Sequence, residues 1–316
     1  MQVLVTGGAG FIGANLVREL LATEGITAVA ALDDLSSGYA SNLAGLDVTF
    51  RQGSILDPAA LDDLVADADA VVHLAAVPSV PRSIADPATS HDANATGTMR
   101  VLDAARTVGG TPQVIVASSS SVYGANPTLP KSEDLRPQPL SPYAVSKLAA
   151  ESYALAYGHC YGLPTLAFRF FNVFGPLQAA GHAYAAAIPA WLDAALRGQP
   201  IPINGDGTQT RDFTHVRTVA ATLTQAVLRC TTAPDPVNLA FGTRRSLLEV
   251  VDAIEAELGV ELSRHHGPDR PGDVRHSQAD GRRLRELLPD VQPIDFHTGL
   301  VETIAWFRTL PGYAAA

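Results

Sequence analysis

Short apolar runs alternate with amphipathic segments along the first half of the chain. The apolar runs predict strands over residues 3–6, 28–32, 48–52, 70–74, 113–117 and 165–170. Segments with helical periodicity between them predict helices over residues 11–22, 58–65, 93–108 and 143–157. Strands that are apolar along their whole length occur in parallel sheets with helices on both faces. The pattern therefore predicts an α/β fold built on a doubly wound parallel sheet.

The pattern changes after about residue 175. Residues 175–184 have the character of a loop, and helices are predicted over residues 188–197, 218–228, 247–259 and 300–310. Turns rich in Pro and Gly separate these helices. We expect residues 1–175 to form the first domain. Residues 176–316 then form a smaller, mixed C-terminal lobe that is partly interleaved with the sheet.

Composition narrows the classes of protein that this chain can represent. Its 316 residues are 47% hydrophobic and only 17% charged, which excludes a disordered chain. The net charge of −10 argues against a nucleic-acid partner, since such proteins usually carry a basic excess. No apolar run approaches the length of about 20 residues that crosses a membrane. The average charge also poses a question, because any anionic ligand must bind against it.

The termini and the cysteines indicate a protein of the cytoplasm. Met1 leads directly into the first strand without a charged region, so no secretory signal is expected. Cys160 and Cys230 match neither a disulfide framework nor a metal-ligand spacing. We expect reduced thiols, no bound metal and a cytoplasmic location.

Glycines cluster between the first strand and the first helix. Gly7, Gly10 and Gly13 have the spacing G-x-x-G-x-x-G. Without Cβ atoms, the backbone N–H groups of such a turn can approach a pyrophosphate, which then faces the positive end of the helix. A second strand ends some twenty residues later, as in dinucleotide-binding units. The sequence therefore predicts a dinucleotide site.

Asp33, at the end of the second strand, favours NAD over NADP. A carboxylate at this position accepts hydrogen bonds from a ribose 2′-hydroxyl and repels a 2′-phosphate. The residues that follow, from Asp34 to Ser37, include no arginine that would bind a phosphate.

A tyrosine and a lysine four residues apart begin another predicted helix. Ser141 is a plausible N-cap and Pro142 fits the first turn. Tyr143 and Lys147 then lie on one face. Tyrosine, with a pKa near ~10, is a poor base at neutral pH, but a neighbouring cation favours the phenolate. By spacing alone, an ordinary surface pair is the more common explanation.

A run of serines, residues 118–121, follows the fifth predicted strand. The carboxyl ends of parallel strands are where ligands bind in α/β proteins, so one hydroxyl is placed to contact a reacting oxygen. A serine-rich turn without function has the same composition.

Together these motifs resemble the extended short-chain dehydrogenase/reductase superfamily, and most closely its nucleotide-sugar 4-epimerases. The resemblance extends over nearly the whole chain. Its motifs are TGGAGFIG at 6–13, HLAA at 73–76, NxxGT at 94–98, the serines, YxxxK at 143–147, RFFNVFGP at 169–176, GDGTQTRDF at 205–213 and RPGD at 270–273. It implies a Rossmann-type fold with a substrate-binding lobe, bound NAD, and a homodimer that pairs the helices at 93–108 and 143–157.

The resemblance also implies roles for individual residues. Ser119, Tyr143 and Lys147 match the catalytic triad. The implied cofactor contacts are Gly7, Gly10, Phe11, Ile12, Gly13, Asp33, Ser37, Ser54, Ile55, Leu74, Ala75, Ala76, Asn94, Tyr143 and Lys147. Relatives usually carry Asp where this chain has Ser54, so a different adenine contact is expected there. The implied substrate contacts are Asn172, Ile188, Ile203, Arg211, Arg270, Asp273 and Ser277.

The implied reaction inverts C4 of a UDP-sugar through a transient 4-keto sugar. Nucleotide-sugar dehydratases share this scaffold but carry acid–base residues directly after the triad hydroxyl, where this chain has Ser120 and Ser121. Non-catalytic NAD-sensing relatives tend to lose the tyrosine or the lysine, and both are present here. The main hypothesis is therefore a UDP-sugar 4-epimerase.

The resemblance leaves the sugar open. The small Ser277 occupies a position that gates the pocket beside the sugar C2 substituent in relatives, which favours UDP-GlcNAc/GalNAc as well as UDP-Glc/Gal. UDP-glucuronate epimerases usually carry arginines after the Gly-Pro pair, where this chain has Leu177 and Gln178. UDP-glucuronate thus stays the alternative substrate, with His182 as one conceivable partner for its carboxylate.

Overall fold

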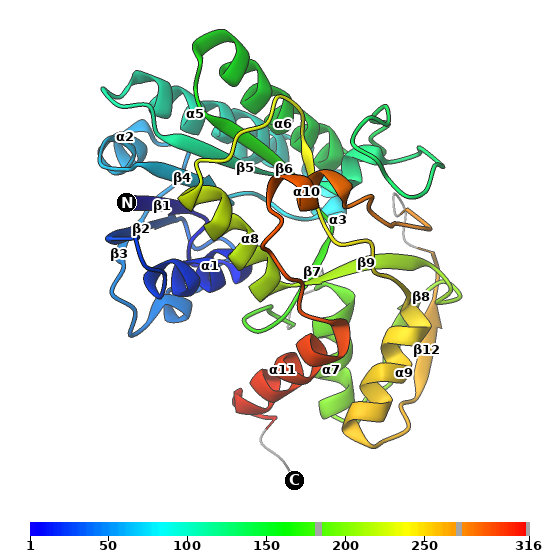
Figure 1. Cartoon of the computed structure of the whole chain (residues 1–316). Helices are drawn as coiled ribbons and strands as arrows, with labels where there is room; N and C mark the ends of the chain where they lie inside the picture. The colour runs from blue at the N-terminus through cyan, green and yellow to red at the C-terminus, as the bar shows by residue number, and fades with distance from the viewer. Residues whose placement is uncertain (181–184, 270–273, 314–316) are drawn as a thin grey trace.

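The computed structural model describes residues 1–180, 185–269 and 274–313. Within these residues, a seven-stranded parallel sheet forms the centre of the larger part of the molecule (Figure 1). Its strand order is β10-β6-β5-β4-β1-β2-β3, so the direction of winding reverses between β1 and β4. The strands are β1 (Gln2–Thr6), β2 (Ala28–Asp33), β3 (Thr49–Gln52), β4 (Ala70–His73), β5 (Gln113–Ser119), β6 (Thr165–Phe170) and β10 (Val237–Leu239). The predicted doubly wound, Rossmann-type sheet is confirmed.

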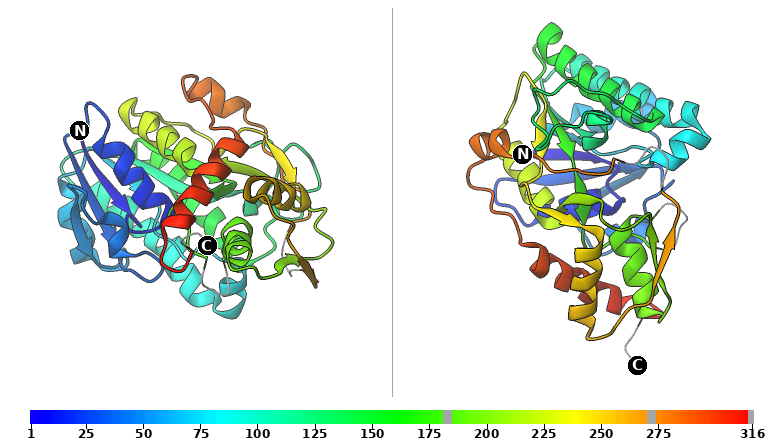
Figure 2. Two further views of the ribbon diagram at one scale, coloured as in Figure 1. Left: turned by 90° about the horizontal axis from the view of Figure 1, so that it is seen from below. Right: turned by 90° about the vertical axis from the view of Figure 1, so that its right-hand side faces the viewer.

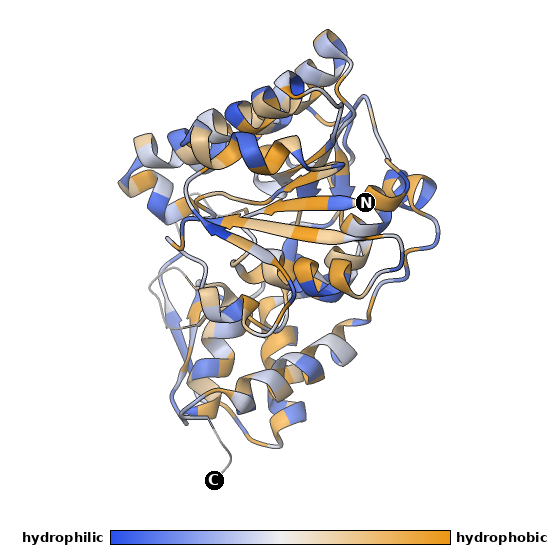
Figure 3. Cartoon of the chain, turned by 90° about the vertical axis from the view of Figure 1, so that its left-hand side faces the viewer, coloured by the Kyte–Doolittle hydropathy of each residue, from blue (hydrophilic) through white to orange (hydrophobic). Residues whose placement is uncertain are grey.

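Helices cover both faces of this sheet because its strands are apolar on both sides (Figure 3). Val3 and Val5 pack on one face against α1 (Phe11–Leu21) and α8 (Val216–Leu228). Leu4, between them in β1, points to the other face. That face is covered by α2 (Pro58–Ala66), α5 (Gly97–Thr107) and α6 (Pro142–Tyr161). Each face therefore buries its own apolar core.

A smaller part packs around a third apolar core below the sheet (Figure 2). One small sheet has the order β11-β9-β7, in which β9 pairs antiparallel with β11 and parallel with β7. Another pairs β12 with β8 in parallel. The elements of this smaller part are β7 (Asn172–Phe174), α7 (Ala187–Leu196), β8 (Ile201–Asn204), β9 (Thr210–His215), β11 (Arg244–Ser246), α9 (Leu247–Leu258), β12 (Arg264–Gly267) and α11 (Phe296–Thr309). Between these elements the chain returns to the large sheet to form α8 and β10, and α10 (Arg282–Leu287) packs beside β10.

Side-chain caps mark the starts of α2 and α6, and the cap predicted at Ser141 is confirmed. The Asp57 carboxylate accepts a hydrogen bond from the Ala59 N–H at 3.1 Å, and the Ser141 hydroxyl accepts one from the Ala144 N–H at 3.2 Å. In both helices a proline occupies the first turn, where its missing N–H costs nothing. These caps fix where α2 and α6 begin.

The structure differs from the sequence prediction mainly in short elements. The predicted helix over residues 93–108 begins instead as a π-helix, Asp92–Thr96, before α5 continues it. Two short helices, α3 (Val80–Ala85) and α4 (Pro87–His91), precede it and were not predicted. The strands of the smaller sheets were not predicted either, because polar residues interrupt them and they form no continuous apolar run. No helix within the described parts of the chain is long and apolar enough to cross a membrane.

His215, at the end of β9, is buried against α11 within the smaller part. Neither ring nitrogen has a hydrogen-bond partner among the described residues. The ring packs against Phe174 at 5.3 Å between centroids, and a Cβ on Gly299 would lie 2.8 Å from its Cδ2. Burial lowers the pKa of His215 to about 4, opposed by Glu302 and reinforced by Arg217. The folded protein therefore holds this imidazole neutral.

We predict that His215 makes the protein less stable in mild acid. Its pKa is lower in the folded state than the usual value near ~6.5, so the unfolded chain binds the extra proton. The stabilising contribution is complete above about pH 6.5 and is lost as the pH falls towards 4. His215→Phe should flatten the pH dependence of the unfolding free energy over this range, by about 3 kcal/mol. Urea unfolding at several pH values measures it, with the exposed His265→Phe as control. A wild-type slope in His215→Phe would contradict the prediction.

Candidate active site

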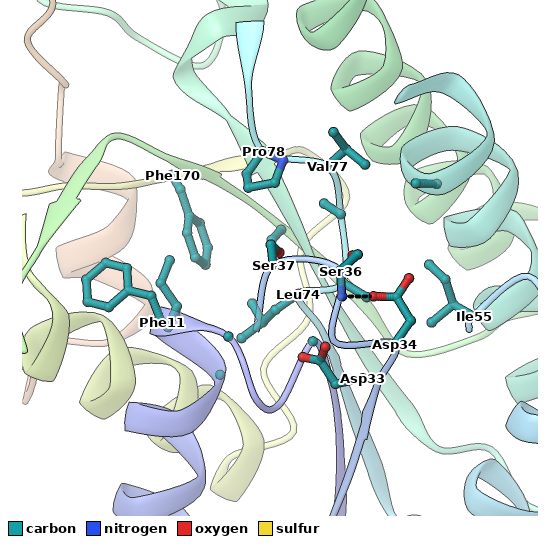
Figure 4. A pocket seen from close by; sticks show the side chains of 18 of the residues that line it. Phe11, Asp33, Asp34, Ser36, Ser37, Ile55, Leu74, Val77, Pro78 and Phe170 are labelled. Atoms are coloured by element: carbon teal, nitrogen blue, oxygen red, sulfur yellow. Dashed lines mark hydrogen bonds between the residues drawn. The ribbon is translucent and has the colours of Figure 1, made fainter. Parts of the chain in front are cut away.

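A cavity of about 720 Å³ opens at the carboxyl ends of the central strands, where the winding of the sheet reverses. All but one of the expected cofactor residues line it, together with Ser119 and Asn172. The residues concerned are Gly7, Gly10, Phe11, Ile12, Gly13, Asp33, Ser37, Ser54, Ile55, Leu74, Ala75, Ala76, Tyr143 and Lys147. In Figure 4, Phe11 and Phe170 lie on one side of this cavity and Ile55 on the other.

The glycine loop lines this cavity. Its backbone packs so closely against neighbouring backbone that side chains would not fit there. Gly7 has a φ of 71°, and a Cβ there would lie 2.7 Å from the Ala75 nitrogen. A Cβ on Gly13 would lie 2.1 Å from the Gly7 carbonyl oxygen. Helix α1 starts at Phe11 without a side-chain cap, so its first N–H groups remain for an anion. The loop thus suits a pyrophosphate.

The Asp33 carboxylate is fixed beside this loop by two backbone donors. Its Oδ2 accepts from the Ala9 N–H at 3.0 Å and its Oδ1 from the Leu35 N–H at 2.8 Å. Burial raises its pKa, and these hydrogen bonds oppose the rise. Asp34, by contrast, only accepts from the Ser36 N–H within the turn, at 2.9 Å (Figure 4). A carboxylate oriented in this way could accept hydrogen bonds from the hydroxyls of an NAD ribose and would repel a 2′-phosphate.

At the opposite end of the cavity, this chain has Ser54 where its relatives usually carry Asp, and the wall beside it is apolar. The Ser54 hydroxyl accepts a hydrogen bond from the Leu56 N–H at 3.2 Å and so shapes the turn after β3. Ile55 packs against Gly97, where a Cβ would lie only 2.4 Å from its Cδ1. An adenine base would therefore meet an aliphatic wall here.

Tyr143, Lys147 and Ser119 meet at the inner end of the cavity. Lys147 Nζ donates to the Ala117 carbonyl at 2.8 Å. The Ser119 hydroxyl accepts hydrogen bonds from the Ser121 N–H at 3.1 Å and the Ser121 hydroxyl at 2.9 Å. Burial raises the pKa of Tyr143, opposed by its hydrogen bond with Ser119. Burial also lowers the pKa of Lys147 to about 8. In the protein alone Tyr143 is thus a phenol, and it needs more positive charge to become a phenolate.

His73 links the end of β1 to the start of α5 by hydrogen bonds of defined direction. The Thr98 hydroxyl donates to the Asn94 carbonyl at 2.6 Å, so it accepts from His73 Nε2 at 2.9 Å. The proton of His73 is therefore on Nε2, and Nδ1 accepts from the Thr6 hydroxyl at 2.7 Å. Burial, aided by the charge of Lys147, lowers the pKa of His73 to about 3. The neutral ring is fixed in one tautomer.

Asn94 lies behind the cavity wall and is the one expected cofactor residue that does not line it. Its side chain is completely buried. Oδ1 accepts from the Val77 N–H at 2.7 Å, and Nδ2 donates to the Ser146 hydroxyl at 3.0 Å. Val77 lines the cavity and Ser146 precedes Lys147, so Asn94 fixes residues that do face a ligand.

A second cavity, of about 680 Å³, adjoins the first and extends into the smaller part. Tyr143, Asn172 and Gln178 line both cavities. Ile188 and Arg211, two of the expected substrate residues, line the second. The Nη1 of Arg211 donates to the Thr210 carbonyl at 2.8 Å and to the Arg275 carbonyl at 3.2 Å. These two hydrogen bonds orient the guanidinium beside β9.

The remaining expected substrate residues lie elsewhere. Ile203 points into the apolar core of the smaller part, with 1% of its surface exposed. Ser277 is buried beside β9, where its N–H donates to the Thr210 carbonyl at 3.0 Å, and it lines neither cavity. Arg270, Asp273 and His182 fall outside the described residues.

Gln178 is a candidate site residue that the sequence analysis named only for the absence of an arginine at its position. Its Nε2 donates to the Val173 carbonyl at 3.2 Å. Its buried Oε1 has no hydrogen-bond partner in the described parts of the protein. The preceding Leu177 has a φ of 71°, an uncommon conformation for a residue with a Cβ. A glutamine after Gly-Pro gives no pattern that would reveal this orientation.

Comparisons with known proteins agree with this geometry. Residues 3–240 match the model of the NAD dependent epimerase/dehydratase family. The chain is 37% identical to the UDP-glucose 4-epimerase of Mycolicibacterium smegmatis, over 98% of this chain and 99% of the relative. It is 35% identical to a dTDP-glucose 4,6-dehydratase of Streptomyces niveus, over 98% and 93% of the two chains.

A solved structure is similarly close. The UDP-N-acetylglucosamine 4-epimerase of Methanobrevibacter ruminantium M1, in complex with UDP-N-acetylmuramic acid, superimposes with a TM-score of 0.90. It is 35% identical, and the match covers 97% of each chain. With the family model and these relatives in agreement, the chain belongs to the NAD-dependent epimerase/dehydratase family and is an NAD-dependent enzyme.

Proposed function

We propose that this protein is a UDP-sugar 4-epimerase acting on UDP-GlcNAc/GalNAc, on UDP-Glc/Gal, or on both. The observation that carries the proposal is that a cavity suited to a dinucleotide and a second cavity with an arginine meet at Tyr143. A sugar in the second cavity would place a hydroxyl at the phenol while its diphosphate reaches Arg211. The planar guanidinium suits this role, since it donates two hydrogen bonds to phosphate oxygens.

Proton transfer at the sugar C4 oxygen falls to Tyr143 in this proposal. NAD, held in the first cavity, would supply a hydride acceptor for C4 of the sugar. Lys147, held by the Ala117 carbonyl, contributes a positive charge that favours the Tyr143 phenolate. Ser119 hydrogen-bonds the same sugar oxygen as Tyr143 removes its proton. The 4-keto sugar then turns about its diphosphate linkage, and Tyr143 returns the proton when the hydride reaches the other face.

The serine cluster favours epimerisation over dehydration. A dehydratase must also move the C5 proton and expel water, which requires acid–base groups beside the triad. Ser120 and Ser121 occupy those positions, and a serine hydroxyl is a poor unassisted acid or base. The Ser121 hydroxyl is in addition engaged with Ser119 at 2.9 Å. Dehydration is therefore the less favoured reaction.

The second cavity favours neutral sugars over glucuronate. Among its described lining residues Arg211 is the single cation, and it is assigned to the diphosphate. The unpartnered Oε1 of Gln178 is an acceptor and would oppose a carboxylate, whereas it suits a hydroxyl or an N-acetyl N–H. UDP-glucuronate is the alternative substrate. The role of Ser277 as a gate stays a prediction, and Gln178 is the better-placed candidate.

The solvent-facing side of α6 supports a homodimer. Val145 and Tyr153 on this helix are 51% and 42% exposed, and Ile84 on the adjacent α3 is 53% exposed. Grouped apolar side chains of this kind are typical of interaction surfaces. Helices α5 and α6 of one protomer would pair with the same helices of the partner.

The reaction can be tested with a panel of UDP-glucose, UDP-GlcNAc and UDP-glucuronate. We expect C4 epimers of the first two, identified by NMR, and no product lighter by one water in mass spectra. Tyr143→Phe should lower kcat by about 10²–10⁴-fold because it removes the proton-transfer group. Bound NAD serves as the folding control. Epimerisation that survives within about tenfold in this variant would exclude Tyr143 as the acid/base.

We predict that Gln178→Leu weakens turnover by removing an acceptor while preserving the size of the side chain. A lost hydrogen bond of about 0.5–1.5 kcal/mol corresponds to a decrease in kcat/KM of roughly 2–12-fold. The exposed Gln292→Leu is the matched control and should leave kcat/KM unchanged. Comparing acetylated with plain hexoses shows which substituent the Oε1 accepts from. An unaltered kcat/KM for every substrate would remove Gln178 from the site.

The proposed dimer predicts a different response at two exposed apolar positions. Tyr153→Asp on α6 should convert the dimer to a monomer, because it buries a charge at the interface. Val260→Asp, at a residue that is 49% exposed beyond the end of α9, should leave the dimer intact. Sedimentation velocity distinguishes the two. A monomeric wild type, or a dimer that persists in Tyr153→Asp, would contradict the proposed surface.

A further inference from the structure

A buried ion pair lies one helical turn beyond Lys147. Glu151 and Arg169 each expose 3% of their side chains. Arg169 donates from Nε to Glu151 Oε2 at 2.9 Å and from Nη2 to Oε1 at 2.7 Å. Removing two charges from water is costly, and a buried pair often stabilises less than apolar residues would. The pair therefore calls for an explanation other than stability.

The three acidic and basic side chains of α6 that face β5 are spaced four residues apart. Tyr143, Lys147 and Glu151 therefore lie along one face of the helix. Each contacts a different one of the last three residues of β5. Lys147 Nζ donates to the Ala117 carbonyl at 2.8 Å, and the Ser118 hydroxyl donates to Glu151 Oε2 at 2.8 Å. Ser119 hydrogen-bonds Tyr143. The helix is thus fixed to the strand at three consecutive positions.

Arg169 is held at least as firmly as its partner. It lies on β6 directly beside Ser118 in the parallel register. Its guanidinium carbon stacks over the Tyr123 ring at 4.7 Å, and its Nη1 donates to the Glu133 carbonyl at 3.3 Å. The Tyr123 hydroxyl in turn donates to Asn238 on β10 at 2.7 Å. Arg169 therefore connects α6 to β6, the strand that pairs with β5 and its Ser119.

We propose that Glu151 and Arg169 are positioning residues for the catalytic triad: their ion pair sets the height and rotation of α6 against β5 while adding no net charge beside Lys147. The inference rests on the proposed function of Tyr143 and Lys147. It assigns the pair no contact with substrate or cofactor.

The charge near Tyr143 and Lys147 depends on which groups the neighbouring elements present to this helix. On α5, Asp103 and Arg106 pair with each other beside Tyr161, at the other end of α6. The neighbouring His73 on β4 is neutral, since its pKa is lowered to about 3. Burial raises the pKa of Tyr123 to about 12, so it is neutral as well. The Glu133 carboxylate accepts from the Asn238 N–H at 2.8 Å, on the far side of Arg169. An unpaired charge at Glu151 or Arg169 would therefore act on Tyr143 and Lys147 with little compensation.

Glu151→Gln tests the proposal with minimal change of shape. The amide oxygen can replace Oε2 and accept from Ser118 and Arg169, while the amide nitrogen faces the Arg169 donor and leaves its charge unneutralised. The extra positive charge should favour the Tyr143 phenolate. We expect the acidic limb of the kcat–pH profile to move down by about half a pH unit or more. We also expect kcat at its optimum to fall about tenfold with little change in KM.

Two further variants separate charge from geometry. Arg169→Lys keeps the positive charge but loses the two-pronged hydrogen bond, so kcat should fall while the acidic limb stays in place. The double variant Glu151→Gln/Arg169→Met removes both charges, so the limb should return to its wild-type position while kcat remains low. Melting temperature and bound NAD show that each variant is folded. If Glu151→Gln does not fold, the other two variants decide, since both avoid an unpaired buried charge.

A titration without substrate distinguishes failure of this inference from failure of the proposed function. Ultraviolet absorbance of tyrosinate, with a Tyr143→Phe background subtracted, reports the ionisation of Tyr143 directly. A downward shift in Glu151→Gln supports the positioning role even if no UDP-sugar is turned over. An unshifted titration and an unshifted acidic limb in folded Glu151→Gln would overturn it. Wild-type kcat in Arg169→Lys and in the double variant would overturn it too.

Discussion

The site depends on the close approach of two backbone segments, the loop after β1 and the end of β4. A Cβ on Gly7 would lie within 2.7 Å of the Ala75 nitrogen, so only glycine allows the contact. The neutral His73 fixes the same junction from below through Thr6 and Thr98. Because the winding of the sheet reverses here, the crossover helices diverge and leave a cavity. The dinucleotide site is thus a consequence of topology and of a few residues that keep the crevice open.

Local charge, and not the average charge, determines what this acidic protein binds. The net charge of −10 is spread over the chain, whereas anions are assigned to the N-terminus of α1 and to Arg211. Backbone N–H groups fix the Asp33 carboxylate beside the glycine loop, where its charge would disfavour a 2′-phosphate. Even the buried Glu151–Arg169 pair contributes no net charge near Tyr143. Attraction for diphosphates is therefore compatible with an acidic surface.

The sequence predicted the large sheet and the residues of the glycine loop because both depend on local pattern. Strands that are apolar along their length, and glycines between a strand and a helix, leave clear signals. Asn94, which the sequence motif assigned to the cofactor site, does not line the cavity. A motif cannot show whether a side chain faces a cavity or supports the residues that do. Ile203 and Ser277 lie on the smaller lobe, where polar residues interrupt the strands and no continuous apolar run marks them. The orientation of Gln178 depends on the φ of 71° at Leu177, which no residue type there indicates.

The proposed reaction makes opposite demands on the two ends of the substrate. The triad must not move, and three consecutive β5 residues bind α6 for that purpose. The sugar must turn over completely between the two hydride transfers. Much of the second cavity is lined by alanines, among them Ala185, Ala186 and Ala190. Such side chains offer no directional contact to a rotating ring, so under the proposed function affinity must come from the nucleotide end. The proposed reaction therefore requires both features: polar contacts that hold Tyr143 in place, and small apolar side chains around the sugar that let it turn.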